Sequence, residues 1–182
     1  KHLAFLAIAS ILISIIAWSF VLQPYQQKRI MTFIHPLADI HGAGYNAFQS
    51  TVAVGSGQIL GKGVGYGTQS RLKFLPEYQT DFIFAAFAEE WGLVGVLIVF
   101  LLFGVIIWRI LVSALVGATN FETLFGLGLA IMFLSHFIIH VGMNIGILPV
   151  TGLPMPFMSY GGSHLFTEFI GLGLLMGMRK YS

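Results

Sequence analysis

The chain has 182 residues, of which 57% are hydrophobic and 9% are charged, and its mean hydropathy is +0.87. Soluble domains carry about 25% charged residues, so this composition excludes an ordinary soluble domain and indicates an integral membrane protein. A formal net charge of +2 is too small to indicate a nucleic-acid partner, and the lack of cysteine excludes disulfides and thiolate metal sites within the chain.

The first predicted element is an apolar helix over residues 3–22, which Pro24 ends. Twenty helical residues reach about 30 Å, enough to cross one hydrocarbon core. The stretch is too long for the apolar region of a signal peptide, and no cleavage motif follows it. Because the chain also begins without Met, we expect a fragment or a trimmed chain.

Three more membrane spans are predicted, over residues 82–108, 121–147 and 161–178. Arg109 closes the second span, and residues 109–121 form a short connection to the third. The glycine-rich residues 23–79 and the proline-rich residues 148–160 cannot cross lipid as irregular backbone, so we expect both on the side opposite the termini. The sequence thus predicts an all-α integral membrane fold: one domain of four helices, with a long, partly helical loop after the first.

Basic residues lie on both sides of this predicted bundle. The side with the termini carries Lys1, Arg109, Arg179 and Lys180, and residues 23–79 carry Lys28, Arg29, Lys62, Arg71 and Lys73. A count of positive charges would place the long loop in the cytoplasm or leave the orientation open. If the loop lies outside the cytoplasm, its positive charge needs a reason, and an anionic ligand supplies one.

Neither a phosphate-binding loop nor a metal motif has the required spacing. Around Lys62 the P-loop pattern fails, because Ser56 replaces its first glycine and Gly63 replaces its Ser or Thr. We expect the glycines here to form tight turns, with backbone contact to a ligand phosphate as the alternative. His136 and His140 share a helix face, but no third zinc ligand has recognisable spacing. We therefore predict no metal site and expect both histidines to face the bundle interior.

Three acidic residues, Glu89, Glu90 and Glu168, fall inside predicted spans. An ionisable residue inside a membrane is costly and is a functional-site hypothesis by default. The alternative is a carboxyl group that is protonated or bonded to a neighbouring helix and only fixes the packing. The sequence leaves both explanations open.

Asp81 lies where a basic, polar segment containing Arg71 and Lys73 meets the second span. Proline and acidic residues are ordinary signals at the start of a helix, so helix capping is the first explanation for this residue. If the helix begins at Pro76, Glu77 and Asp81 are neighbours four residues apart. Two close carboxylates raise the pKa of one of them, and a raised pKa would suit a general base.

Several sequence blocks occur together in a specific order. Residues 75–85 read LPEYQTDFIFA, and residues 146–163 read GILPVTGLPMPFMSYGGS. Residues 24–33 read PYQQKRIMTF, and short glycine motifs follow between residues 44 and 70. In these blocks, which extend over essentially the whole chain, the sequence resembles the SEDS family, that is, the RodA and FtsW proteins.

This resemblance implies a peptidoglycan glycosyltransferase that polymerises lipid II in the bacterial cytoplasmic membrane, usually with a class B penicillin-binding protein. It implies a fold of roughly ten membrane helices, of which the chain would supply the last four. It would place residues 23–79 and 148–160 on the outer side of the membrane. The essential aspartate of the family corresponds to Asp81.

The mechanism expected from this resemblance has Asp81 as general base on the 4-hydroxyl of the acceptor sugar, with undecaprenyl pyrophosphate leaving from the donor. Basic residues of the long loop, Arg29 first, would stabilise the departing diphosphate. Further candidates for sugar or phosphate contacts are Gln49, Gln69, Glu77 and Ser159. No cofactor is identified, although a divalent cation is compatible with this chemistry.

The chain departs from the family pattern at three positions. His140 stands where the family usually has Asn, His164 replaces a small residue, and Glu168 puts an acid into a usually apolar helix. The sequence does not decide between a role in elongation and one in division. Two other functions also stay open: a lipid II flippase or transporter, whose path intramembrane acids would fit, and a non-catalytic scaffold for cell-wall assembly. The resemblance favours the polymerase.

Overall fold

The computed structural model describes residues 2–35, 42–72, 74–117 and 119–181. Every regular element within these ranges is a helix and none is a strand, so the predicted all-α class is confirmed there. The elements in chain order are α1 (His2–Ile16), the π-helical η1 (Ala17–Val21), α2 (Pro24–Ile34), α3 (Ala43–Ser56), α4 (Thr68–Arg71), α5 (Ile83–Leu115), α6 (Asn120–Asn144) and α7 (Gly162–Tyr181).

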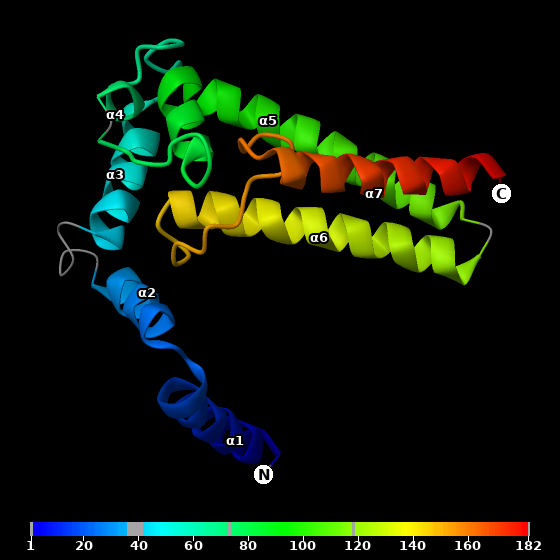
Figure 1. Ribbon diagram of the computed structural model, residues 1–182, viewed down its shortest axis with the longest axis horizontal. Coiled ribbons are helices and arrows are strands. Elements are labelled where there is room, and N and C mark those ends of the chain that lie inside the picture. Colours follow the sequence, from blue (N-terminus) through cyan, green and yellow to red (C-terminus); the bar gives the residue numbers. More distant parts are fainter. Residues whose placement is uncertain (1, 36–41, 73, 118, 182) are drawn as a thin grey trace.

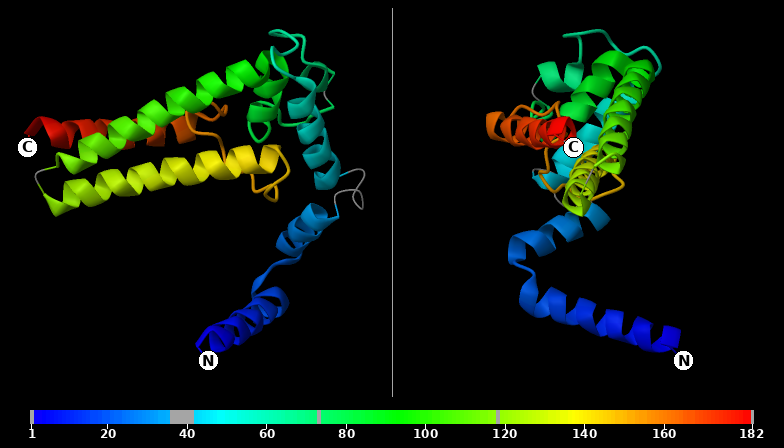
Figure 2. Two further views of the ribbon diagram at one scale, coloured as in Figure 1. Left: turned by 180° about the vertical axis from the view of Figure 1, so that it is seen from behind. Right: turned by 90° about the vertical axis from the view of Figure 1, so that its right-hand side faces the viewer.

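Of the described helices, α5 and α6 are long and apolar enough to cross a membrane. They contain 33 and 25 residues and pack side by side in opposite directions (Figure 1). The shorter α7, with 20 residues, packs against both (Figure 2). The predicted spans over residues 82–108 and 121–147 thus correspond to membrane-capable helices, whereas those over residues 3–22 and 161–178 stay predictions.

The two long helices end at other residues than predicted. We expected Arg109 to close the helix, but α5 continues to Leu115. Arg109 is exposed and interrupts only the apolar run, while Ala114, which is fully buried, keeps the last turn packed. In contrast, α6 ends early, at Asn144, because Gly146 just beyond it adopts a left-handed backbone with φ of 77°.

The core between α5, α6 and α7 is largely aromatic. Phe103 of α5 stacks on Phe137 of α6, with ring centroids 4.1 Å apart. Phe133 of α6 is fully buried and meets Phe157, from the loop before α7, edge to face at 5.1 Å. Close packing of this kind holds helices together where lipid supplies no hydrophobic drive. The contact of Phe133 with Phe157 holds the loop before α7 against α6.

One break interrupts α5, at Gly92, whose backbone (φ 65°, ψ −165°) is not helical. The loop after α3 fills this break with main-chain hydrogen bonds. Leu93 N donates to Gln58 O at 2.9 Å, and Lys62 N donates to Glu89 O at 3.0 Å. A left-handed backbone at such a close approach is accessible to glycine and disfavoured for other residues.

Residues 23–79 contain three of the helices, α2, α3 and α4. Pro24 occupies the first turn of α2, and Gln23 forms a capping box before it. The α-helical part of the predicted first helix ends at Ile16, and the π-helical η1 continues it to Val21, just before Pro24. In both figures α1 and α2 extend away from the bundle, whereas α3 packs against α5 and α6.

Candidate active site

Asp81 lies two residues before α5 begins and does not cap it. The N-cap residue is Phe82, and α5 has no side-chain capping bond, so the capping explanation is wrong. The Asp81 side chain is half-buried at the end of the bundle where the loops gather. None of the hydrogen bonds between described residues uses its carboxylate.

The backbone around Asp81 is held by donors from the other end of the sequence. Three successive carbonyl oxygens, those of residues 79–81, each accept a hydrogen bond. The donors are Tyr160 N at 2.9 Å, Ser159 Oγ at 3.0 Å and Asn144 Nδ2 at 3.1 Å, in that order. The end of α6 and the loop before α7 therefore fix the position of the aspartate.

Asn144 is the central member of this arrangement, and our sequence analysis did not identify it. It is fully buried, and its Oδ1 accepts from Ala85 N and from Ser50 Oγ, both at 3.2 Å. Because Nδ2 binds the Asp81 carbonyl, one side chain connects α3, α6 and the start of α5. The available sequence signal was a lone Asn at the end of a long apolar helix.

Burial and two charged residues shift the pKa of Asp81. Partial burial raises the pKa of its carboxyl group, the nearby Glu77 carboxylate raises it further, and the Arg29 guanidinium lowers it. The helix does not begin at Pro76, so Glu77 and Asp81 are not neighbours on a helix as we had considered. A non-helical turn with Glu77 at φ 51° brings the two carboxylates close instead.

Arg29 of α2 connects distant parts of the chain at this site. Its Nη1 donates to the carbonyl oxygen of Thr151 at 3.1 Å, across 122 positions of sequence. The next residue, Gly152, faces Asp81 so closely that an added Cβ would lie 3.6 Å from Oδ2. Asp81, Arg29 and the loop after α6 thus meet in one place.

An apolar cavity of about 220 Å³ lies between α2, α3 and the loop after α6. Its lining includes Arg29, Phe33, Phe48, Ile145 and Leu148. Arg29 therefore stands between this cavity and the aspartate, a combination suited to a molecule with an anionic group and an apolar chain.

The other predicted contact residues are distributed unevenly. Glu77 lies beside Asp81, as described above. Ser159 is buried, and its hydroxyl is engaged with Thr80 O and Met155 N, so it supports the backbone. Gln49 lies on α3, and no described contact joins it to Asp81. Gln69 belongs to a separate cluster around Glu89.

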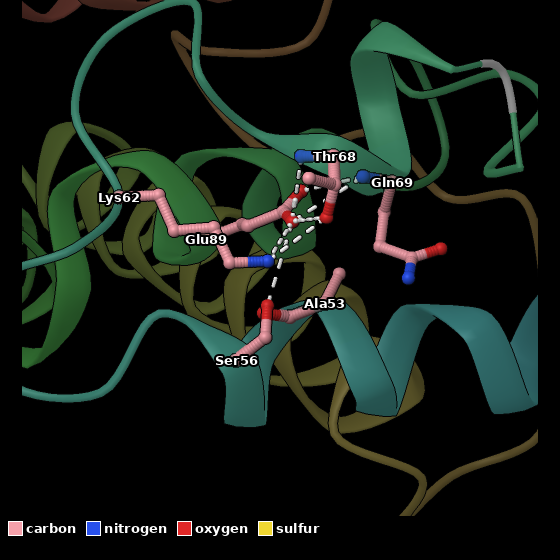
Figure 3. A network of polar contacts seen from close by, with 6 residues as sticks. All are labelled: Ala53, Ser56, Lys62, Thr68, Gln69 and Glu89. Carbon is pink, nitrogen blue, oxygen red and sulfur yellow. Dashed lines mark hydrogen bonds and ion pairs between the residues drawn. The ribbon is translucent and has the colours of Figure 1, made fainter.

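This second cluster surrounds the fully buried carboxylate of Glu89 (Figure 3). Lys62 Nζ lies 2.7 Å from Oε1, and the backbone N–H groups of Thr68 and Gln69 donate to the same carboxylate at 2.9 and 3.1 Å. Ser56 Oγ lies 3.4 Å away. The amine of Lys62 pairs with Glu89. This pairing supports a role for Glu89 in anchoring the loop after α3, and it gives no support to a phosphate-binding loop at Lys62.

Other polar residues of the spans also make contacts, although His136 Nδ1 and His140 Nε2 are buried without a hydrogen bond among the described residues. Glu90 accepts a hydrogen bond from Gly65 N at 3.1 Å. The Nδ1 atom of His140, which is fully buried, lies 2.8 Å from Leu153 O, and the His136 ring stacks on that of His164 at 5.7 Å. Among the described residues, no group of three His, Asp or Glu side chains is arranged to hold a metal ion.

Comparisons with known proteins place the chain in a family. A family model for cell cycle proteins of the FtsW, RodA and SpoVE type matches residues 1–182. The chain is 45% identical over 166 residues to the peptidoglycan glycosyltransferase MrdB of Escherichia coli K12, and the matched region covers 91% of this chain and 45% of MrdB. It is 41% identical over 161 residues to the stage V sporulation protein E of Bacillus subtilis strain 168, covering 87% and 43%.

Two solved structures share the fold. One comes from a peptidoglycan synthase complex that coordinates polymerization and crosslinking. Its TM-score is 0.73 at 30% identity, and the match covers 98% of this chain and 48% of the matched chain. The other is a point mutant of the rod shape determining protein RodA from Thermus thermophilus, with a TM-score of 0.56 at 34% identity, covering 67% and 38%. The chain spans about half the length, or less, of these relatives. It belongs to the SEDS family of FtsW, RodA and SpoVE proteins.

Proposed function

We propose that this chain is the catalytic part of a peptidoglycan glycosyltransferase that polymerises lipid II, with Asp81 as the general base. The observation that carries the proposal is the meeting of Asp81, Arg29 and Gly152, with Arg29 also lining an apolar cavity. The relatives named as peptidoglycan glycosyltransferases support the same activity.

The chemistry proposed for Asp81 is a proton transfer coupled to a displacement. The carboxylate takes the proton of the acceptor 4-hydroxyl while the oxygen of that hydroxyl bonds to the anomeric carbon of the donor. The bond from that carbon to the diphosphate oxygen breaks, and the diphosphate leaves with the electron pair. A base with a raised pKa suits this step, because a general base works best when its pKa approaches the working pH.

Arg29 is proposed to hold the departing diphosphate. A guanidinium carries five N–H donors, and the bond to the Thr151 carbonyl uses one of them. Its side chain is exposed, so the other donors can face a ligand. The neighbouring cavity is proposed to take the first isoprene units of the lipid, because its lining is mostly apolar.

The placement in the membrane is part of the proposal. Four spans over residues 3–22, 82–108, 121–147 and 161–178 would put residues 23–79 and 148–160 outside a bacterial cytoplasmic membrane. A class B penicillin-binding protein is the proposed partner, which the structural relative from a synthase complex supports. Gln49 and Gln69 stay lower-ranked candidates for substrate contacts. No cofactor is proposed, and assays should include a divalent cation as a variable.

The flippase alternative gains no support from the buried acids. Glu89 is bound by Lys62 and backbone amides. Glu168 accepts a hydrogen bond from Phe157 N, and its other oxygen lies 2.7 Å from His164 Nε2. Both carboxyl groups therefore make contacts within the protein. A translocation path would instead need polar groups that face a passage.

The test is the Asp81→Asn variant in the complete enzyme, purified with its penicillin-binding partner and assayed for glycan polymer from lipid II. We expect the rate to fall by about 100-fold or more. Glu122→Gln is the matched control, because it makes the same chemical change about 33 Å away along α6. Undiminished polymer from Asp81→Asn would end the general-base proposal, and lipid movement without polymer in the wild type would support a flippase.

A further inference from the structure

A buried polar cluster between α6 and α7 has no part in the proposed chemistry. Glu168 of α7 is 1% exposed, and its Oε1 lies 2.7 Å from Nε2 of His164, one turn earlier on the same helix. The His164 ring stacks on that of His136 from α6. Burying a carboxyl group this deeply costs free energy unless the group is paired. The contacts of Glu168 therefore indicate a role within the fold.

The second oxygen of Glu168 reaches the loop before α7. Oε2 accepts a hydrogen bond from Phe157 N at 3.1 Å. Phe157 has a left-handed backbone, with φ of 61°, which residues other than glycine rarely adopt unless their surroundings hold them there. The bond to Glu168 and the packing of the Phe157 ring on Phe133 and Phe169 supply that support.

The turn that contains Phe157 also contacts the segment before Asp81. Ser159 Oγ accepts from Met155 N at 2.7 Å and donates to Thr80 O at 3.0 Å. Tyr160 N donates to Gln79 O. A continuous chain of contacts therefore leads from Glu168, through the turn of residues 155–160, to the residue next to the aspartate.

We propose that Glu168 is a positioning residue: through its bond to Phe157 N it fixes the turn of residues 155–160, which in turn holds the backbone that carries Asp81. The inference rests on the proposed function, since it assigns Glu168 a part in placing the base. A displacement of about 1 Å at a reacting group can reduce a rate by about 100-fold, so the effect should appear in kcat.

The experiment compares three substitutions in the complete enzyme with its partner, using lipid II. Glu168→Leu removes the acceptor for Phe157 N and should lower kcat by about 10- to 100-fold, with KM within about twofold. Glu168→Gln keeps an oxygen acceptor and should restore kcat to within about threefold of wild type. Leu175→Ala, at a buried position on the same helix, should lower the melting temperature and leave kcat close to wild type.

Ser159→Ala serves as a second route if Glu168→Leu does not fold, because it removes the Thr80 contact and should reproduce the loss of kcat. The inference is overturned if Glu168→Leu or Ser159→Ala keeps the wild-type kcat, if only KM changes, or if Leu175→Ala loses as much kcat. Asp81→Asn in the same assay separates the two proposals. If it retains full activity, the proposed base is wrong whatever Glu168 does.

Discussion

The side-chain amide of Asn144 donates a hydrogen bond to the backbone carbonyl of Asp81 at 3.1 Å. The same side chain accepts from Ala85 N in the first turn of α5 and from Ser50 Oγ of α3. One residue at the end of α6 therefore sets the position of the aspartate relative to two other helices.

Replacement of Asn144 should harm both stability and activity. Asn144→Leu keeps the number and branching of the side-chain heavy atoms, and leaves the Asp81 carbonyl and the Ala85 amide without this partner. The Ser50 hydroxyl keeps its bond to the main-chain carbonyl oxygen of residue 144. Each buried polar group left unpaired costs about 1–3 kcal/mol, so we expect a loss of about 2 kcal/mol or more in the free energy of unfolding. Thermal unfolding and a polymerisation assay would measure this, with Asn120→Leu, at an exposed position of α6, as the control.

The pH dependence of the polymerisation rate should report on Asp81. A base acts when deprotonated, so activity is present above the pKa of Asp81 and is lost as the pH falls through it. Because burial and Glu77 raise that pKa, the loss should begin at a higher pH than for an ordinary aspartate. The measurement is kcat/KM against pH.

Two variants should shift the acidic limb of this pH profile in opposite directions. Glu77→Gln removes a negative neighbour and should move the acidic limb to lower pH. Arg29→Gln removes the positive neighbour that lowers the pKa, and should move the limb to higher pH. If both limbs stay at the wild-type position, the ionisation seen in the rate does not belong to Asp81.

The ion pair of Lys62 and Glu89 should respond unequally to loss of either partner. Lys62→Met leaves a fully buried carboxylate without its counter-charge, and we expect it to cost about 3 kcal/mol. Glu89→Gln leaves a lysine whose side chain is 30% exposed and can reach water, so the cost should be smaller. Hydrogen exchange at the amides of Thr68 and Gln69 should accelerate in both, and Lys62→Arg should stay near wild type. Equal losses of stability would argue against this account.

Two glycines of α5 should respond in opposite directions to alanine. Gly92 has φ of 65°, and a Cβ there would lie 2.3 Å from the backbone nitrogen of Gly61, so Gly92→Ala should destabilise the protein by about 2 kcal/mol or more. Gly104 is helical with open space around it, so Gly104→Ala should stabilise it by about 0.5–1 kcal/mol. Thermal unfolding of both variants in one detergent is the measurement, and the same sign for both would refute the prediction.

The sequence predicted the features that depend on local pattern. The all-α class and the two membrane-capable helices follow from long apolar runs, and the end of the first helix follows from Pro24. The predicted end of α5 was wrong because Arg109 interrupts the apolar run without interrupting the backbone hydrogen bonds of the helix. The break at Gly92 was missed because it requires hydrogen bonds from the loop after α3, which no local pattern contains.

The candidate site was only partly predictable for the same reason. Asp81 was singled out by its place at the start of a span, and the resemblance assigned it the role of base and brought in Arg29. No local rule could show that Arg29 meets Thr151 across 122 positions. Asn144 carries no charge and matches no motif, so its role emerges only when α3, α5 and α6 are packed. The role of Glu89 was open in the sequence, and its partners in the structure favour anchoring.

The three bound carbonyls before and at Asp81 have a consequence for repeated turnover. They hold the main chain of residues 79–81 while leaving side-chain rotation at the aspartate free of those bonds. If Asp81 is the base, it can collect a proton from one acceptor and discharge it to water by turning about its own Cα–Cβ bond. Successive sugars could then be added to a growing strand without the surrounding loops opening between cycles.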